Sequence, residues 1–170
     1  MSHLFLPDVI IDSLTDLKPE YLKGLDIKLL MLDFDNTIVP YTTNVPTEEM
    51  ANWLEMMKAS DVVLCVVSNS RNQRVPSFCD KYGIPCITRA RKPGRQGVFR
   101  CLAQFAIPAQ NAALVGDQIY TDILCANRAG IKAILVKAID NHNFWLKARH
   151  VAEKPFIFAA RKRRIHYEKY

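Results

Sequence analysis

The chain of 170 residues carries a net charge of +6 and is 49% hydrophobic and 24% charged, which suits one soluble domain that buries a core without disulfides. Its five cysteines are odd in number and include no C-x-x-C pair, which argues against a disulfide framework and a zinc site, and Cys65 and Cys101 fit reduced core positions. Because the N-terminus lacks a basic leader and no apolar stretch could cross a bilayer, we expect a cytoplasmic protein.

Apolar patterns along the chain alternate between the spacing of strands and the spacing of helices. In chain order they predict a lead-in (1–27), a strand (27–33), a helix (46–60), a strand (61–67), a helix (71–82), a strand (85–88), a helix (94–107), a strand (112–116), a helix (118–130) and a strand (131–136). Such alternation predicts an α/β fold with a doubly wound, parallel, five-stranded, Rossmann-like sheet. We assign residues 1–146 to this domain and residues 147–170 to a basic C-terminal extension.

Two of the predicted helices have clear local signals. The helix at 46–60 has one apolar stripe at helical spacing, formed by Met50, Trp53, Leu54 and Met57. The helix at 71–82 ends at Gly83, a residue that tolerates the left-handed conformation common at helix ends. Pro76 inside this helix favours a later start or a kink.

The first four predicted strands are each followed by side chains that can bind ions or phosphate. These are Asp33, Asp35 and Thr37 after the first strand, Ser68 and Asn69 after the second, Lys92 after the third, and Asp117 and Asp122 after the fourth. In a doubly wound sheet, ligands bind beyond the carboxyl ends of the strands, so these groups are expected at one rim. Carboxylates at the end of a buried strand need a positive partner, and Mg²⁺ prefers carboxylate and phosphate oxygens. We therefore expect a Mg²⁺ ion that faces a phosphate.

The distribution of charge supports this expectation. Residues 1–70 contain 4 basic and 11 acidic side chains, whereas residues 71–100 contain 8 basic and 1 acidic. We expect the acidic and the basic sections to converge on one metal-and-phosphate site.

Each candidate residue also has a simpler structural interpretation. Asp35 and Asn36 could form a common turn, Asp122 could be an acid at a helix N-terminus, Ser68 an N-cap and Lys92 a solvated charge. Taken together, these interpretations require all four groups to reach the same end of one sheet by accident. We therefore favour the functional interpretation.

Four segments of the chain, "DFDNT", "VVSNS", "RKPG" and "GDQIYTD", resemble the four ordered motifs of the haloacid dehalogenase (HAD) superfamily of phosphohydrolases. The likeness runs from about residue 28 to residue 136. The form of the first and fourth motifs, together with the lead-in, is similar to subfamily IIIA, the YqeG-like phosphatases. That group also includes phosphatidylglycerophosphatases of mitochondria.

The resemblance implies a role for each motif residue. Asp33 would be the nucleophile that forms an aspartyl-phosphate, and Asp35 the general acid and then the base. Ser68, the Asn69 backbone and Lys92 would neutralise phosphoryl oxygens, and Thr37 would support the loop. The Mg²⁺ ligands would be Asp33, the Asp35 backbone carbonyl and Asp117, with Asp122 as a ligand or as a group that orients waters.

The gaps between the motifs leave no room for a large cap domain. About ten residues separate the first motif from the next helix, and twenty-three separate Ser68 from Lys92. The site is therefore expected to be open to solvent or covered by another subunit of an oligomer. An open site favours a phosphate displayed on a large molecule, or a phosphate read with little selectivity, so the substrate is a small metabolite or a lipid phosphate.

The C-terminal extension carries 8 basic and 2 acidic residues, interspersed with Phe156, Ile157, Phe158 and Tyr167. The simpler interpretation is a surface helix with solvated charges. The alternative is peripheral contact with an anionic membrane surface. Nucleic acid is disfavoured as a partner because no RNA-binding motif accompanies the charge.

Two other classes of function remain open at the level of sequence. A phosphoacceptor receiver domain shares the sheet, the acidic Mg²⁺ site and the lysine, and acts as a switch. Its acid pair precedes an acceptor aspartate on a later strand, however, whereas here the Asp33–Asp35 pair follows the first motif strand. A catalytically weak HAD-type domain that only binds its partner is the second alternative.

Overall fold

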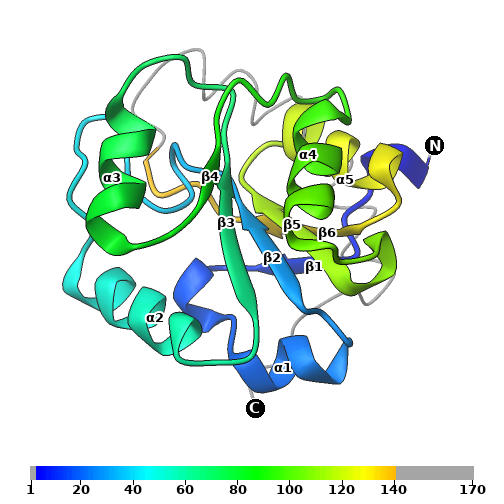
Figure 1. Cartoon of the computed structure of the whole chain (residues 1–170), viewed down its shortest axis with the longest axis horizontal. Helices are drawn as coiled ribbons and strands as arrows, with labels where there is room; N and C mark the ends of the chain where they lie inside the picture. Colours follow the sequence, from blue (N-terminus) through cyan, green and yellow to red (C-terminus); the bar gives the residue numbers. More distant parts are fainter. Residues whose placement is uncertain (1–2, 141–170) are drawn as a thin grey trace.

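The structure, a computed structural model, describes residues 3–140, which form a parallel sheet with helices on both faces (Figure 1). The strands are β1 (Val9–Ile11), β2 (Leu29–Leu32), β3 (Val63–Val67), β4 (Cys86–Ile87), β5 (Ala112–Gly116) and β6 (Lys132–Val136). The helices are α1 (Pro19–Gly24), α2 (Glu48–Lys58), α3 (Arg74–Tyr82), α4 (Gln96–Phe105) and α5 (Leu124–Ala129). Four short helical turns complete the fold: η1 (His3–Phe5), η2 (Leu14–Asp16), η3 (Ala109–Asn111) and the π-helical η4 (Ile119–Ile123).

The strands lie in the order β1-β6-β5-β2-β3-β4, and neighbouring strands are parallel. From β2 the chain moves outward through β3 to β4, and it then returns to the opposite side of β2 with β5. The strand order therefore reverses between β2 and β5, which is where ligands bind in such sheets. Asp33 and Asp117 directly follow these two strands, so the doubly wound α/β architecture is confirmed.

The sheet has six strands, so the predicted number of five was wrong. The additional strand is β1, which lies in the lead-in and pairs with β6 at the edge of the sheet. Asp8 supports the pairing, because its backbone N–H donates to Ala133 O at 2.8 Å and its Oδ2 accepts from Ala133 N at 2.8 Å. A strand of three residues has no periodicity of its own, and β6 supplies the edge on which it forms.

Alternate residues of the strands face two separate apolar clusters. Along β2, Leu30 and Leu32 belong to the cluster that α1, α2 and α3 cover, whereas Leu29 and Met31 belong to the cluster that α4 and α5 cover. The predicted stripe of α2 (Met50, Trp53, Leu54, Met57) is buried in the first cluster. Cys65 and Cys101 are fully buried and free, as predicted.

Helix α3 starts at Arg74, three residues later than the predicted start at residue 71. Pro76 therefore lies in the first helical turn, where it removes no intrahelical hydrogen bond. The helix ends as predicted, since Gly83 caps it with a φ of 63°.

Within residues 3–140 there is no cap domain, and no helix is both long and apolar enough to cross a membrane. The predicted domain boundary at residue 146 and the basic extension of residues 147–170 lie outside the described residues.

Candidate active site

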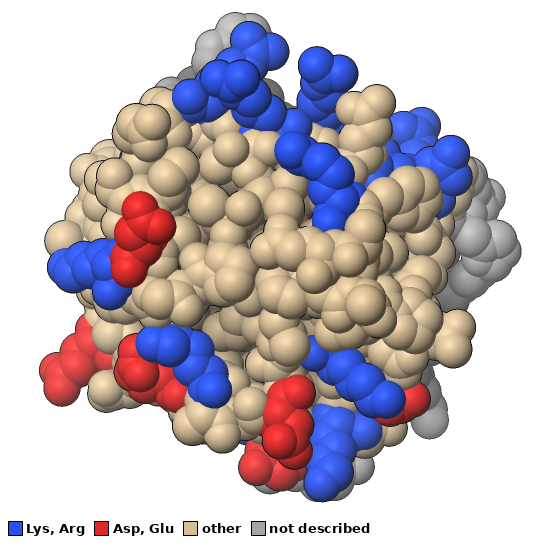
Figure 2. Space-filling model, viewed as in Figure 1, with Lys and Arg blue, Asp and Glu red and all other residues tan. Residues whose placement is uncertain are grey.

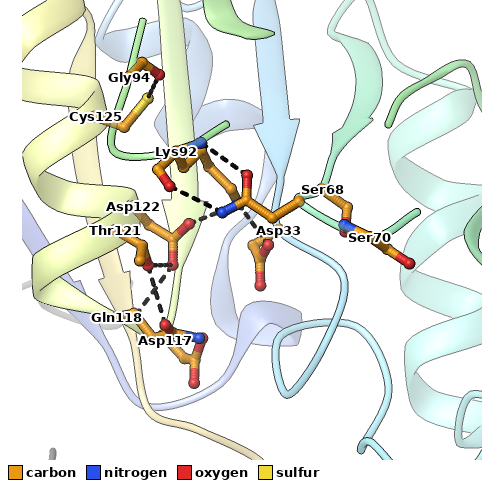
Figure 3. Close-up of polar contacts among 11 residues, drawn as sticks. Asp33, Ser68, Ser70, Lys92, Gly94, Asp117, Gln118, Thr121, Asp122 and Cys125 are labelled. Atoms are coloured by element: carbon orange, nitrogen blue, oxygen red, sulfur yellow. Dashed lines mark hydrogen bonds and ion pairs between the residues drawn. The ribbon is translucent and has the colours of Figure 1, made fainter. Parts of the chain in front are cut away.

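A buried lysine bridges two carboxylates at the carboxyl edge of the sheet. The Lys92 ammonium lies 2.5 Å from Asp33 Oδ1 and 2.7 Å from Asp122 Oδ1 (Figure 3). Asp33 follows β2, Lys92 precedes α4, and Asp122 belongs to η4, so three distant segments of the chain supply the network. All three are less than 10% exposed. Such a buried charge network needs mutual pairing, because an unpaired charge there would be strongly destabilising.

The charges of this network shift the pKa values of its members. Burial raises the pKa of the Asp33 carboxyl from 3.8 to about 7, against the lowering effect of Lys92, and the Asp122 and Asp35 charges add to the rise. Burial alone would lower the pKa of Lys92, but the Asp122 and Asp33 carboxylates raise it above the ordinary 10.5. Lys92 therefore remains a cation, and burial disfavours the ionised form of Asp33.

The π-helical turn η4 orients the remaining acids of the rim. Gln118 N donates to Asp122 Oδ2 at 3.2 Å, and Gln118 Nε2 donates to Asp117 Oδ1 at 3.3 Å (Figure 3). The Thr121 hydroxyl lies 3.3 Å from Asp122 Oδ2. Single π-helical turns occur often at functional sites. The helix predicted at 118–130 thus begins with a turn of different pitch, which sequence periodicity does not reveal.

Gly116 makes the approach of Asp122 possible. A Cβ atom at position 116 would lie 2.3 Å from Asp122 Cγ, far inside van der Waals contact. The glycine at the end of β5 is therefore required by the packing of the acid against the strand.

Asp35 lies apart from the lysine network and pairs with Arg74, the first residue of α3. Arg74 Nη2 donates to Pro40 O at 2.7 Å and to Thr43 O at 2.6 Å, and its Nε donates to Asn44 Oδ1. Arg74 was not predicted from the sequence. A basic residue near a helix start has no distinctive signal, since its partner is 39 positions away.

Hydrogen bonds connect the loop after β3 to the loop after β4, and both loops carry phosphate-binding candidates. Asn69 Nδ2 donates to Lys92 O at 2.9 Å, and Lys92 N donates to Asn69 Oδ1 at 2.7 Å. Ser68 Oγ accepts from Ser70 N at 3.1 Å, and the hydroxyl proton can still be donated to a phosphoryl oxygen. These reciprocal bonds fix the Lys92 backbone relative to the end of β3.

Thr37 is 1% exposed, and its hydroxyl has no hydrogen-bond partner among residues 3–140. Its neighbour Asn36 adopts a left-handed φ of 61° and donates from Nδ2 to Asp140 O at 2.7 Å. Both residues lie inside the turn that carries Asp35, and the supporting role of Thr37 stays a prediction.

A cavity of about 190 Å³ brings most of the candidate residues together. It is lined by Asp33, Asp35, Tyr41, Ser68, Asn69, Ser70, Lys92, Gln118, Thr121 and Asp122. Asp117 and Thr37 are outside this lining, although Asp117 is hydrogen-bonded to Gln118. Tyr41 and Thr121 were not singled out from the sequence; only the folded loops bring them to the cavity.

The carboxylates at the rim fit a divalent cation. Oxygens of Asp33, Asp117 and Asp122 lie within 4.8 Å of one another, and all three residues are buried. Hard oxygen donors of this kind, beside space for a phosphate, suit Mg²⁺. A divalent cation would also stabilise the ionised form of Asp33, which burial disfavours.

Two comparisons of the sequence with known proteins found relatives. The family model of HAD-hydrolase-like proteins matches residues 89–155. "Probable phosphatase YqeG" from Bacillus subtilis (strain 168) is 30% identical over 168 residues, which cover 99% of this chain and 98% of the relative.

Two solved structures share the fold. The cobalt-bound deoxy-D-mannose-octulosonate 8-phosphate phosphatase (YrbI) from Haemophilus influenzae is 12% identical with a TM-score of 0.54, and the match covers 81% of this chain and 91% of that chain. The 3-deoxy-D-manno-octulosonate 8-phosphate phosphatase from Yersinia pestis is 17% identical with a TM-score of 0.54, over 75% of this chain and 72% of that chain.

Proposed function

The chain belongs to the HAD-like hydrolases, in the group of the YqeG-like phosphatases, and from this premise we propose that it hydrolyses phosphomonoesters with Mg²⁺ through an aspartyl-phosphate on Asp33. One observation carries the proposal. The Asp33 carboxylate, held by Lys92 at 2.5 Å beside Asp122, lines a small cavity at the point where the strand order reverses. A nucleophile and a cation for the phosphoryl oxygens therefore lie together.

In the first step an Asp33 carboxylate oxygen attacks phosphorus. An O–P bond to Asp33 forms and the bond from phosphorus to the ester oxygen breaks. Asp35, which lines the same cavity, donates its proton to the leaving oxygen, so that an alcohol departs. Lys92 and the Ser68 hydroxyl stabilise the charge on the phosphoryl oxygens.

In the second step water attacks the aspartyl-phosphate. Asp35, now ionised, takes one proton from the water, the new O–P bond forms, and the bond between Asp33 and phosphorus breaks. Inorganic phosphate is released, and both carboxyl groups regain their starting states.

The Mg²⁺ ion would be held by Asp33, Asp117, Asp122 and the backbone carbonyl of Asp35. When bound, it would neutralise carboxylate charge and allow an anionic phosphate to approach an anionic nucleophile.

The substrate is a phosphomonoester of a small metabolite or of a lipid. The lack of a cap domain within residues 3–140 supports a substrate that extends beyond the cavity. A lipid substrate also agrees with the basic extension of residues 147–170, which carries 8 basic and 2 acidic residues. We place the protein in the cytoplasm, with peripheral contact at anionic membrane surfaces.

The experiment that tests the metal-dependent reaction is hydrolysis of para-nitrophenyl phosphate with Mg²⁺, with excess chelator, and after Mg²⁺ is restored. Activity is expected only when Mg²⁺ is present. In parallel, Mg²⁺ should raise the melting temperature of the wild type but not of Asp117→Asn, because ligand binding to the folded state stabilises it. Asp80→Asn, which removes an exposed acid of α3, is the matched control. Full activity in excess chelator would contradict the proposal.

A further inference from the structure

A second, larger cavity adjoins the one that holds Asp33. It measures about 570 Å³ and is lined by Asn69, Arg71, Arg89 and Arg91. Asn69 lines both cavities, so the two are neighbours. Arg71 and Arg91 are also adjacent in sequence to Ser70 and Lys92, which line the smaller cavity. The larger cavity thus combines three cationic side chains and no acidic one.

The three arginines differ from the other cations of the same segment. Within residues 3–140, no hydrogen bond or ion pair is found for the guanidinium groups of Arg71, Arg89 and Arg91. By contrast, Arg100 donates to Thr88 O at 2.8 Å, and Lys92 pairs with the carboxylates of Asp33 and Asp122. The arginines of the cavity therefore have a charge and several donors available for a ligand.

The charged side chains that line this cavity all have the same sign. Figure 2 shows several Lys and Arg side chains along the upper edge of the molecule, toward which β3 runs in Figure 1, and further Lys and Arg side chains lower down. The acidic side chains visible in this view lie lower on the molecule. A concave region lined by a single sign of charge concentrates ligands of the opposite sign.

The backbone that presents two of these arginines is conformationally costly. Arg89 has a φ of 50° and Arg91 a φ of 59°, in the left-handed region that side-chain-bearing residues rarely adopt. Ala90 between them is buried against Gly97, where a Cβ atom would lie 2.5 Å from the Ala90 Cβ. The loop is also held by hydrogen bonds from Arg89 N to Ser70 O and from Ala90 N to Ser68 O. The fold thus fixes both arginine backbones beside the phosphate-binding loop.

We propose that Arg71, Arg89 and Arg91 form a second anion-binding subsite, which holds another anionic group of the same phosphomonoester substrate. The inference rests on the proposed phosphatase function and narrows its substrate class to molecules with two anionic groups. Arginine suits this task because its planar fork binds phosphate oxygens through two donors. The second group is a phosphomonoester, a phosphodiester of the kind found in lipid headgroups, or a carboxylate.

Matched substrates separate this subsite from the catalytic cavity. The probes are alkanediol monophosphates, the corresponding bisphosphates, and monophosphates whose far end carries a methyl phosphodiester. The wild type should show a kcat/KM for the doubly anionic probes that exceeds the monophosphate value by about tenfold or more. When the alkane chain between the two anionic groups is varied in length, kcat/KM should be highest at one length, which reports the spacing between the two cavities. A preference for the methyl phosphodiester over the bisphosphate identifies a lipid-like headgroup as the source of the second anion.

The variant with Arg89→Gln and Arg91→Gln should abolish the preference, so that the kcat/KM ratio of doubly to singly anionic probes falls to about one. The matched control combines Lys81→Gln and Arg95→Gln, which remove the same charge from side chains that lie over Tyr82 and Phe99 outside the cavity. The control should keep the wild-type ratio. The variant with Arg89→Lys and Arg91→Lys should retain part of the preference for doubly anionic probes, because the positive charge remains but the two-donor fork of arginine is lost.

A binding measurement keeps the test independent of turnover. In the Asp33→Asn background, calorimetric titration with the best bisphosphate should show an affinity that Arg89→Gln with Arg91→Gln lowers about tenfold or more. Two results would overturn the subsite. The wild type could show the same kcat/KM for doubly and singly anionic probes, or the cavity variant and the control could change the ratio of these values by the same factor. Failure of the proposed function is a different outcome, because the wild type would then hydrolyse none of the probes.

Discussion

The guanidinium group of Arg74 pairs with the carboxylate of Asp35 and at the same time binds the backbone carbonyls of Pro40 and Thr43. It also lies 5.0 Å from the centre of the Phe34 ring. One side chain at the start of α3 thus connects the candidate general acid to the loop that follows it. We infer that Arg74 is a positioning residue, which sets where the Asp35 carboxyl group lies relative to the cavity.

The variant Arg74→Gln should impair protonation of the leaving oxygen more than the attack by Asp33. We expect its kcat/KM for an alkyl phosphate to fall by about 100-fold, within the usual contribution of general acid catalysis, and that for para-nitrophenyl phosphate to fall much less, since that leaving group needs little protonation. The kcat/KM of Arg74→Lys for the alkyl phosphate should lie between the values of the wild type and of Arg74→Gln. If both substrates slow by the same factor, Arg74 has only a structural role.

The proposed roles of the two aspartates predict different defects. Asp33→Asn should show no turnover and no phosphoenzyme, because the attacking oxygen is lost. Asp35→Asn should retain the fold and Mg²⁺ binding but slow both steps by about 100-fold or more. Rapid quench with a labelled substrate measures the phosphoenzyme directly. Near wild-type turnover in Asp33→Asn would show that the nucleophile is misassigned, and a wild-type phosphoenzyme that persists for hours would favour a receiver-like switch.

Removing the Asp33 charge should stabilise the protein in the presence of chelator. The pKa of Asp33 is about 7 in the folded protein and 3.8 ordinarily, so folding favours its protonated form. The stability of the wild type should therefore fall as pH rises from 3.8 to about 7 and then level off. Asn at this position does not titrate. The shift corresponds to about 4 kcal/mol at about pH 8, and the weaker hydrogen bond from Lys92 to an amide offsets part of it. We therefore expect Asp33→Asn to be more stable by about 1–2 kcal/mol, or roughly 2–8 °C in melting temperature.

Denaturant unfolding of both proteins across this pH range measures the difference, and other titrating groups cancel in the comparison. The difference should shrink as pH falls toward 4. A difference that is constant with pH would show that the Asp33 charge is not the cause. Ser77→Ala, at an exposed position on α3, serves as a control with no expected trend.

The sequence predicted the fold and the meeting of Asp33, Ser68, Lys92 and Asp122 for one physical reason. Strands buried on both faces are continuous apolar runs, and parallel strands deliver the residues that follow them to a common edge. The chemistry of those residues is then sufficient to expect a phosphate and a cation at that edge.

The features that the sequence did not predict depend on contacts between distant segments. Strand β1 forms because β6 offers an edge, and Val9–Ile11 carries no periodic signal of its own. Arg74 and Arg100 both lie on helices in the basic section of the chain, yet Arg74 reaches Asp35 whereas Arg100 binds Thr88 O. Only the packing of α3 and α4 decides which cation serves the site.

The basic extension of residues 147–170 is predicted to attach the protein to anionic membranes. Each lysine or arginine near such a surface contributes about 1 kcal/mol, an effect that salt weakens. The full-length chain should therefore co-sediment with vesicles that contain phosphatidylglycerol at low salt, remain in solution with neutral vesicles, and be released from the anionic ones at high salt. Replacing Arg161, Lys162, Arg163 and Arg164 with glutamine removes about four such contributions and should weaken binding at low salt by up to about 1,000-fold.

The matched control replaces four lysines that are exposed on the described part of the chain, namely Lys23, Lys28, Lys81 and Lys137, and so removes the same charge elsewhere. If the control weakens binding as much as the variant of the extension, the attraction arises from net charge alone. If the full-length chain does not bind anionic vesicles at low salt, the extension has another role. The proposal of a lipid substrate is then supported by the active site and the arginine cavity alone.

Because all four motifs lie before residue 123, the variant of the extension should keep its activity on para-nitrophenyl phosphate. Loss of vesicle binding with retained turnover would separate membrane attachment from catalysis.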